Sequence, residues 1–253
     1  MTNNKQASNE GKVAIVTGAS RGIGASIAKR LASEGFAAIV NYAGRAADAQ
    51  AVVGEIRDAG GRAEAIQADV SVPAQVAALF DQTATLFGGV DVLINNAGVM
   101  QTGLVPLSET DDALFDKIVD TNLKGTFNAL RVAAKTLRQG GRIVNFSSSV
   151  TALAMPGYSV YAATKAAVQT MTLIFAKELR GRSITVNAVA PGPTATDLFL
   201  TGKTQEQIDH LAKMPPMERL GRPEDIAAVV SFLVGPDGGW IDGQTLRANG
   251  GII

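Results

Sequence analysis

The sequence contains no cysteine, which excludes disulfide bonds, thiolate catalysis and cysteine-ligated metals. Histidine occurs only at His210, so a multi-histidine zinc site is excluded and a Ser-His-Asp triad has little basis. We expect His210, which stands between polar neighbours, to lie on the solvated surface. The function is therefore expected to involve no metal.

The chain also lacks an excess of charge of either sign, since 23 basic side chains balance 23 acidic ones. A nucleic-acid-binding protein normally carries a strong basic excess, at least locally. No uninterrupted apolar run approaches the roughly 20 residues that cross a bilayer. Residues 1–11 are polar, without the apolar core of a signal peptide, and we expect a flexible tail there. These features predict a cytoplasmic protein that binds neither nucleic acid nor membranes.

The rest of the chain alternates short β-branched runs with longer alanine-rich segments of helical spacing. Segment 27–35 is one such helix, ended by Gly35, and segment 72–88 is another, opened by Pro73. Repeated strand–helix–strand units with nearly continuous apolar strands indicate a parallel sheet covered on both faces. We predict one α/β domain over 12–253, a doubly wound parallel sheet of about seven strands. The expected strands are 13–17, 37–41, 62–67, 90–95, 142–147, 184–190 and 245–248.

The longest stretch without strand signals is 192–222, which includes Pro193, Pro215 and Pro216. Long excursions in compact domains are often active-site lids. We therefore predict a lid at about 193–217.

Three glycines directly follow the first expected strand, in TGASRGIG at 17–24. Glycine permits a tight turn and a close backbone approach to phosphate, while the following helix offers free N–H groups to the anion. A lone glycine turn is weak evidence, but its place between the first strand and the first helix favours dinucleotide binding. The spacing is not that of nucleoside triphosphatases, and no lysine follows, which disfavours kinase or ATPase chemistry.

The end of the second expected strand bears on the choice of dinucleotide. NAD-binding folds usually place an acid there for the ribose 2′-hydroxyl, but this strand ends Asn41, Tyr42, Ala43 and has no carboxylate until Asp48. Arg21 and Arg45 stand nearby, as a 2′-phosphate would require, so we predict NADP(H). The alternative is that both arginines are solvated surface charges.

Six motifs in order resemble those of the short-chain dehydrogenase/reductase family, from about Lys12 to the end of the chain. They are TGASRGIG, NNAG at 95–98, Asn122 in DTNLKGTF, SSS at 147–149, YAATK at 161–165 and PGPTAT at 191–196. The resemblance implies an extended Rossmann fold of seven strands and a homotetramer built through two long helices and the C-terminal strand.

The resemblance also implies roles for individual residues. The catalytic positions would be Asn122, Ser148, Tyr161 and Lys165. The cofactor-binding positions would be Gly18, Ser20, Arg21, Gly22, Ile23 and Gly24; Asn41, Tyr42, Ala43 and Arg45; Asp69 and Val70; Asn95, Ala97 and Gly98; Tyr161 and Lys165; Pro191, Gly192, Thr194 and Thr196.

The spacing of Tyr161 and Lys165 has a chemical rationale of its own. A tyrosine has a pKa near ~10, and a lysine one helical turn away can stabilise the phenolate and lower that pKa. Tyr158 has no such partner, because its i+4 residue is Ala162. Without the other motifs, the same pair would be read as an ordinary helical turn.

We expect an NADP(H)-dependent reductase of ketones or aldehydes, reversible as an alcohol dehydrogenase. The alternatives are a 3-oxoacyl-[acyl-carrier-protein] reductase, a sugar dehydrogenase and a non-catalytic dinucleotide-binding regulator. A carrier-protein substrate would need basic surface near the site, for which the candidates are Lys135, Lys177, Arg180 and Arg182. Segments 150–159 and 194–217 are expected to set substrate selectivity, and their apolar side chains suggest hydrophobic carbonyl compounds.

Overall fold

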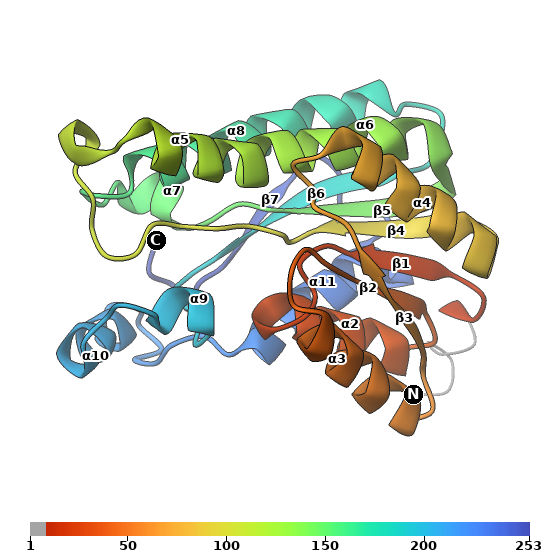
Figure 1. Ribbon diagram of the computed structural model, residues 1–253, viewed down its shortest axis with the longest axis horizontal. Helices are drawn as coiled ribbons and strands as arrows, with labels where there is room; N and C mark the ends of the chain where they lie inside the picture. Colours follow the sequence, from red (N-terminus) through yellow and green to blue (C-terminus); the bar gives the residue numbers. More distant parts are fainter. Residues whose placement is uncertain (1–8) are drawn as a thin grey trace.

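The computed structural model describes residues 9–253 as a parallel sheet between two helical layers (Figure 1). The expected flexible tail falls mostly outside the described residues. Seven strands pair in parallel in the order β3-β2-β1-β4-β5-β6-β7. Their bounds are β1 Val13–Val16, β2 Ala37–Tyr42, β3 Arg62–Gln67, β4 Val90–Asn95, β5 Leu137–Phe146, β6 Thr185–Pro191 and β7 Thr245–Ala248.

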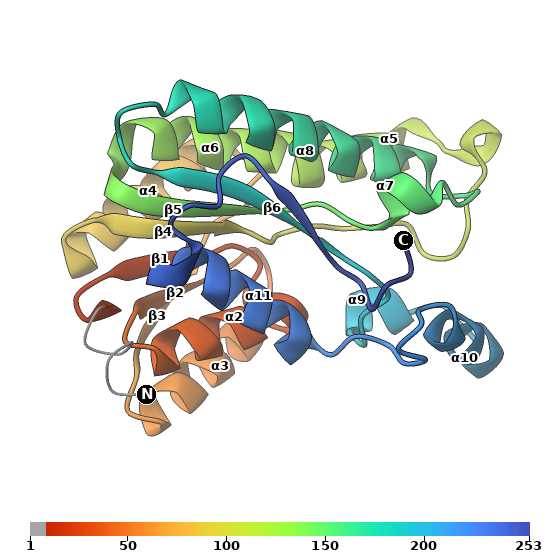
Figure 2. The same ribbon diagram turned by 180° about the vertical axis from the view of Figure 1, so that it is seen from behind.

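The helices divide between the two faces of this sheet. Figures 1 and 2 show α2, α3 and α11 on one face and α4, α5, α6 and α8 on the other. Their bounds are α2 Gly22–Ser33, α3 Ala46–Asp58, α4 Pro73–Phe87, α5 Asp112–Val119, α6 Gly125–Thr136, α7 Val150–Leu153, α8 Ser159–Glu178, α9 Asp197–Leu200, α10 Gln205–Lys213 and α11 Pro223–Val234. The doubly wound fold expected from the sequence is confirmed.

Strand β1 shows how one apolar run serves both layers. Alternate side chains of a strand point to opposite faces. Ala14 and Val16 accordingly join the core cluster beneath α2 and α11, whereas Val13 and Ile15 join the cluster beneath α4 and α6. In α4, Val76, Leu79, Phe80 and Thr83 are all buried, as the helical spacing predicts.

The strand order reverses between β1 and β4, because β2 and β3 extend to one side of β1 and β4 to β7 to the other. At such a reversal the connections leave in opposite directions and open a crevice at the carboxyl ends of the strands. This crevice lies beside the glycine turn.

Two regions differ from the expected elements. Strand β5 begins at Leu137, five residues before the expected start, because Leu137 pairs with Val90 across a register irregularity. The expected lid contains two helices, α9 and α10. The sequence analysis noted only that this region lacks strand signals and predicted no helices in it. Thr204 starts α10 by accepting a hydrogen bond from the backbone N–H of Gln207, whose side chain accepts in return. None of the helices within residues 9–253 is long and apolar enough to cross a lipid bilayer.

Candidate active site

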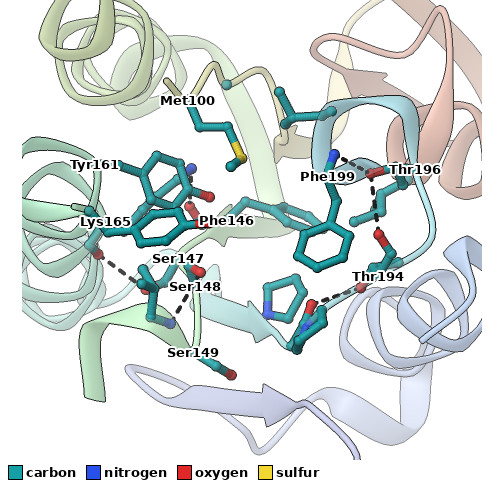
Figure 3. Close-up of a pocket in the computed structure, with 18 of the residues that line it drawn as sticks. Met100, Phe146, Ser147, Ser148, Ser149, Tyr161, Lys165, Thr194, Thr196 and Phe199 are labelled. Carbon is teal, nitrogen blue, oxygen red and sulfur yellow. Dashed lines mark hydrogen bonds between the residues drawn. The ribbon is translucent and has the colours of Figure 1, made fainter. Parts of the chain in front are cut away.

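Two adjoining cavities open at the carboxyl ends of the strands. One, of about 330 Å³, runs along the glycine turn and the end of β2. The other, of about 160 Å³, lies over the end of β5 and the start of α8 (Figure 3). They share five lining residues and so form one groove: Ile23, Asn96, Gly98, Thr196 and Leu198.

The glycine turn forms one wall of the larger cavity. Gly18 has a φ of +62°, and a Cβ there would lie 2.9 Å from the Cα of Ala97. A Cβ on Gly24 would lie 2.5 Å from the carbonyl oxygen of Gly18. Helix α2 begins at Gly22 and no side chain caps its first N–H groups. The turn thus needs glycine for its own packing and presents a helix N-terminus to the groove.

Polar side chains fix this turn to the neighbouring strands. Asn41 is buried, accepts a hydrogen bond from Gly18 N at 3.3 Å, and donates to the carbonyl oxygens of Ile66 at 3.2 Å and Ala68 at 3.0 Å. Its side chain is therefore occupied within the protein. It acts on the groove by holding Gly18 in place.

The NNAG turn is tied to the same wall. The hydroxyl of Thr17 accepts hydrogen bonds from the backbone N–H groups of Asn96 and Ala97, both at 3.0 Å. Asn96 in turn donates to the carbonyl oxygen of Thr17 at 2.8 Å. These bonds set the distance across the groove between the ends of β1 and β4.

The expectation for Asn95 is corrected by the structure. Its side chain is buried in the sheet and donates to Asn145 Oδ1 at 2.8 Å, and Asn95 lines neither cavity. Asn96 lines both cavities instead, because consecutive side chains at a strand end point to opposite sides. The sequence analysis missed Asn96, although the second asparagine of the motif was a usable signal. It also missed four further residues that line the larger cavity, namely Gly44, Ala68, Val99 and Thr121.

Both expected arginines line the larger cavity. Arg21 pairs with Asp197 at 3.1 Å and Arg45 with Asp48 at 2.9 Å, and all four side chains are exposed. Asp69 lines the cavity, with Oδ1 accepting from the backbone N–H and the hydroxyl of Ser71 at 2.9 and 2.7 Å. The remaining expected residues lining this cavity are Ser20, Gly22, Ile23, Tyr42, Ala43, Val70, Ala97 and Gly98.

Tyr161, Lys165 and the segment Ser147–Ser149 lie together on one side of the smaller cavity (Figure 3). Tyr161 and Lys165 are on α8, and the serines follow β5. Burial raises the pKa of Tyr161 to about 12, although a hydrogen bond with Ser148 lowers it in part. The phenol is therefore protonated at neutral pH.

Lys165 does not play its expected part in the pKa of Tyr161. Its Nζ lies 5.7 Å from the centroid of the Tyr161 ring and donates to the carbonyl oxygen of Phe146 at 2.8 Å. Burial lowers the pKa of Lys165 itself to about 8. The expected lowering of the pKa of Tyr161 is wrong for this structure, because desolvation of the phenolate outweighs the other influences.

Asn122 lies in a π-helical turn, Asp120–Lys124, that joins α5 to α6. Such turns interrupt the helical ladder and are frequent at functional sites. Asn122 is fully buried, accepts from Val99 N and donates to Val99 O, both at 2.8 Å. A Cβ on Gly98 would lie 3.3 Å from Asn122 Oδ1 and 3.5 Å from Lys165 Nζ. The absence of a side chain at Gly98 leaves these two polar groups facing one small space.

The opposite side of the smaller cavity is formed by the segment after β6. Figure 3 shows Thr194, Thr196 and Phe199 there. Thr196 caps α9 by accepting from Phe199 N at 3.3 Å, and Thr194 donates to the carbonyl oxygen of Gly192 at 2.9 Å. Pro191 and Gly192 also line this cavity, whereas His210 is exposed and lines neither cavity. The remaining wall is apolar: Met100, Phe146, Val150, Leu153, Met155, Pro193, Leu198 and Leu211.

Comparison with known proteins agrees with this arrangement. Residues 18–253 match the family model described as enoyl-(acyl carrier protein) reductase. The chain is 44% identical to the NADPH-dependent aldehyde reductase-like protein of Arabidopsis thaliana, covering 96% of this chain and 94% of the relative. It is also 44% identical to the 3-oxoacyl-[acyl-carrier-protein] reductase of Staphylococcus epidermidis, covering 95% and 98%.

Among solved structures, a short-chain dehydrogenase from Burkholderia cenocepacia in complex with NADP superposes with a TM-score of 0.91 at 41% identity. The match covers 96% of this chain and 98% of the other. The sequence relatives, the fold and the matching family model agree. The chain belongs to the short-chain dehydrogenase/reductase family of oxidoreductases.

Proposed function

We propose that the protein is an NADP(H)-dependent reductase of uncharged, apolar ketones or aldehydes. The observation that carries the proposal is the meeting of Tyr161, Ser148 and Lys165 in an apolar cavity that is continuous with a dinucleotide-sized groove. A phenol that lines the substrate cavity is a group that can supply the proton which reduction of a carbonyl needs.

The groove fits the cofactor in both shape and chemistry. The start of α2 and the backbone of the glycine turn would receive the pyrophosphate, and Asp69 and Val70 line the adenine end. No carboxylate ends β2, and Arg21 and Arg45, which line this cavity, are available to exchange their present carboxylate partners for a 2′-phosphate. The NADPH-dependent relative and the NADP-bound neighbour support this choice. When bound, NADPH supplies the hydride.

The chain's own residues then handle the substrate oxygen. Ser148 donates a hydrogen bond that orients the carbonyl, and Tyr161 transfers its phenolic proton to the oxygen as negative charge develops there. Lys165 lines the same cavity beside Tyr161, where its ammonium would donate to the ribose hydroxyls of the cofactor. Asn122 holds the end of the NNAG turn through Val99, and its Oδ1 shares the small space beside Gly98 with Lys165 Nζ. The apolar wall limits water around these groups.

A 3-oxoacyl-[acyl-carrier-protein] reductase is the second candidate, and the staphylococcal relative favours it. The basic residues expected to receive the carrier are badly placed, however. Lys177 follows Tyr161 by 16 residues on α8, which is about 24 Å along the axis. Lys135 is likewise in the last turn of α6. Arg182 donates to the carbonyl oxygens of Ala134 and Leu137 at that same end.

The loop that begins at Met100 beside the cavity carries acids instead. Glu109, Asp111 and Asp112 occur there, and residues 100–112 include no lysine or arginine. These acids line neither cavity, but they would repel an acidic carrier that docked against this loop. A small carbonyl compound is therefore favoured over a carrier-bound acyl group.

We also propose that the protein assembles as a homotetramer with residues 193–217 acting as a lid. Half-exposed apolar side chains on α5, α6 and α8 support a helical interface, namely Phe115, Phe127, Leu173 and Ile174. Size-exclusion chromatography with light scattering measures the assembly directly. The cytoplasmic location expected from the sequence stays a prediction, and the Arabidopsis relative is chloroplastic.

The test of the function is a substrate panel assayed with NADPH and with NADH. The panel contains medium-chain aldehydes, aryl ketones, a 3-oxoacyl thioester of a small thiol, the same acyl group on its carrier protein, and sugars. We expect the highest kcat/KM with apolar aldehydes or ketones and with NADPH. A higher kcat/KM for the carrier-bound acyl group would support the second candidate, and a preference for NADH would contradict the roles of Arg21 and Arg45.

A further inference from the structure

Gln169 lies one helical turn beyond Lys165 on α8 and lines neither cavity. Its side-chain amide nevertheless points to the serine segment. Nε2 donates two hydrogen bonds, to Ser147 Oγ at 2.7 Å and to Thr151 Oγ1 at 3.2 Å. Both hydrogens of the amide are thereby used on the segment that contains Ser148.

The hydroxyls of Ser147 and Thr151 each donate a further hydrogen bond to a backbone carbonyl oxygen. Ser147 Oγ donates to the carbonyl oxygen of Lys165 at 3.1 Å, a bond visible in Figure 3. Thr151 Oγ1 donates to the carbonyl oxygen of Ser148 at 2.9 Å. A hydroxyl has one hydrogen to give, so each must accept from Gln169 in order to donate onward. The direction of the whole network therefore depends on Gln169 being a double donor.

The position of the Ser148 hydroxyl depends on this backbone. Apart from its bond with Tyr161, the hydroxyl accepts only a 3.3 Å hydrogen bond from Val150 N. Its place relative to Tyr161 is set by how the segment is held against α8. Lys165 adds one link through Phe146 O and a second through its own carbonyl oxygen to Ser147 Oγ, and Gln169 adds two more.

We propose that Gln169 is a positioning residue, which sets the distance between the hydroxyl of Ser148 and the α8 residues Tyr161 and Lys165. The proposal rests on the reductase function proposed above. Gln169 lines neither cavity, and it would act on Ser148 through its hydrogen bonds to Ser147 and Thr151. A displacement of about 1 Å in a reacting group can cost on the order of 100-fold in rate.

The kinetic test compares two substitutions with a control on the same helix. Gln169→Ala removes both donors, and Gln169→Glu keeps the shape but offers only acceptors when ionised. Thr170→Ala is the control, because Thr170 is exposed and bonds only to Ala166 O within the helix. We expect kcat to fall by about 10-fold to 100-fold in Gln169→Ala, with KM for NADPH within about twofold, and no change in Thr170→Ala.

The Gln169→Glu enzyme has a signature that loss of stability alone does not give. When protonated, the introduced carboxyl can donate one hydrogen bond, so activity relative to the natural enzyme should rise as pH falls through its pKa. In a Ser148→Ala background, Gln169→Ala should cost less than about threefold, since there is no serine hydroxyl left to place. Thermal unfolding of each variant shows whether it is folded.

Hydrogen exchange provides a readout that does not depend on turnover. Backbone amides of residues 147–151 should exchange faster in Gln169→Ala than in the natural protein or in Thr170→Ala. If the natural protein reduces no carbonyl compound, the proposed function fails while this measurement still tests the positioning. Unchanged exchange, or an unchanged kcat in a folded Gln169→Ala enzyme, would overturn the inference.

Discussion

Asn41 makes the sharpest prediction about how the glycine turn is supported. Asn41→Ala removes the two hydrogen bonds to Ile66 O and Ala68 O and the one from Gly18 N. A buried polar group left without its partner costs roughly 1–3 kcal/mol. Gly18 lines the groove and is only partly buried, so the two carbonyls dominate. We expect a loss of about 2–6 kcal/mol in the free energy of unfolding, together with weaker NADPH binding.

The measurement is urea unfolding followed by far-UV circular dichroism, because the single tryptophan, Trp240, is 99% exposed and reports poorly on burial. Gln67→Ala is the matched control on the adjacent strand. Gln67 is exposed and makes a single 2.8 Å bond to Ala43 O, so a change within about 0.5 kcal/mol is expected. If Asn41→Ala unfolds within that same margin, the bracing role of Asn41 is refuted.

Two further predictions concern a buried charge and a close backbone contact. The pKa of Lys165 is lowered to about 8, so the folded state holds fewer protons than the unfolded state between pH 8 and 10.5. Stability therefore rises with pH across this window, by roughly 3 kcal/mol relative to Lys165→Met, as denaturant titrations at several pH values would measure. A constant difference in stability between the two proteins would contradict this pH dependence. Gly24→Ala puts a Cβ 2.5 Å from Gly18 O, so we expect the affinity for NADPH to fall at least 10-fold. Fluorescence titration measures this affinity, and an unaltered value would exclude the steric argument.

The sequence predicted the strands well because most of them are continuous β-branched runs buried on both faces. Strand β5 is the informative exception. Its first part, Leu137–Gly141, contains glycines and polar residues and joins the sheet only through pairing with Val90. Such long-range pairing leaves no local pattern.

For the candidate site too, local motifs in the sequence predicted some features, whereas others depend on tertiary structure. Motif spacing identified Tyr161, Lys165 and Ser148, and the structure brings them together. It could not show that Asn95 turns into the sheet while Asn96 faces the groove, because that depends on where the strand ends. Nor could i+4 spacing give the pKa of Tyr161, which depends on burial by segments far away in the sequence.

The basic residues illustrate a third limit. Lys177 and Arg180 lie at the end of the expected catalytic helix or just after it, and a sequence shows only that they belong to that region. The length of α8 places Lys177 about 24 Å from Tyr161 along the helix axis, and Arg180 follows the end of the helix. Helix direction relative to the active edge of the sheet, which a sequence does not show, is therefore what favours a small carbonyl compound in the proposed function.

The central claim is that Tyr161 delivers the proton that accompanies hydride transfer. Tyr161→Phe removes only the hydroxyl and keeps the ring, so the fold and NADPH binding should persist. General acid catalysis contributes typically 10²–10⁴-fold, and we expect kcat for NADPH-dependent reduction of the best carbonyl substrate to fall by about that factor. A Tyr161→Phe enzyme that binds NADPH and reduces the same substrate within twofold of the natural rate would contradict the account.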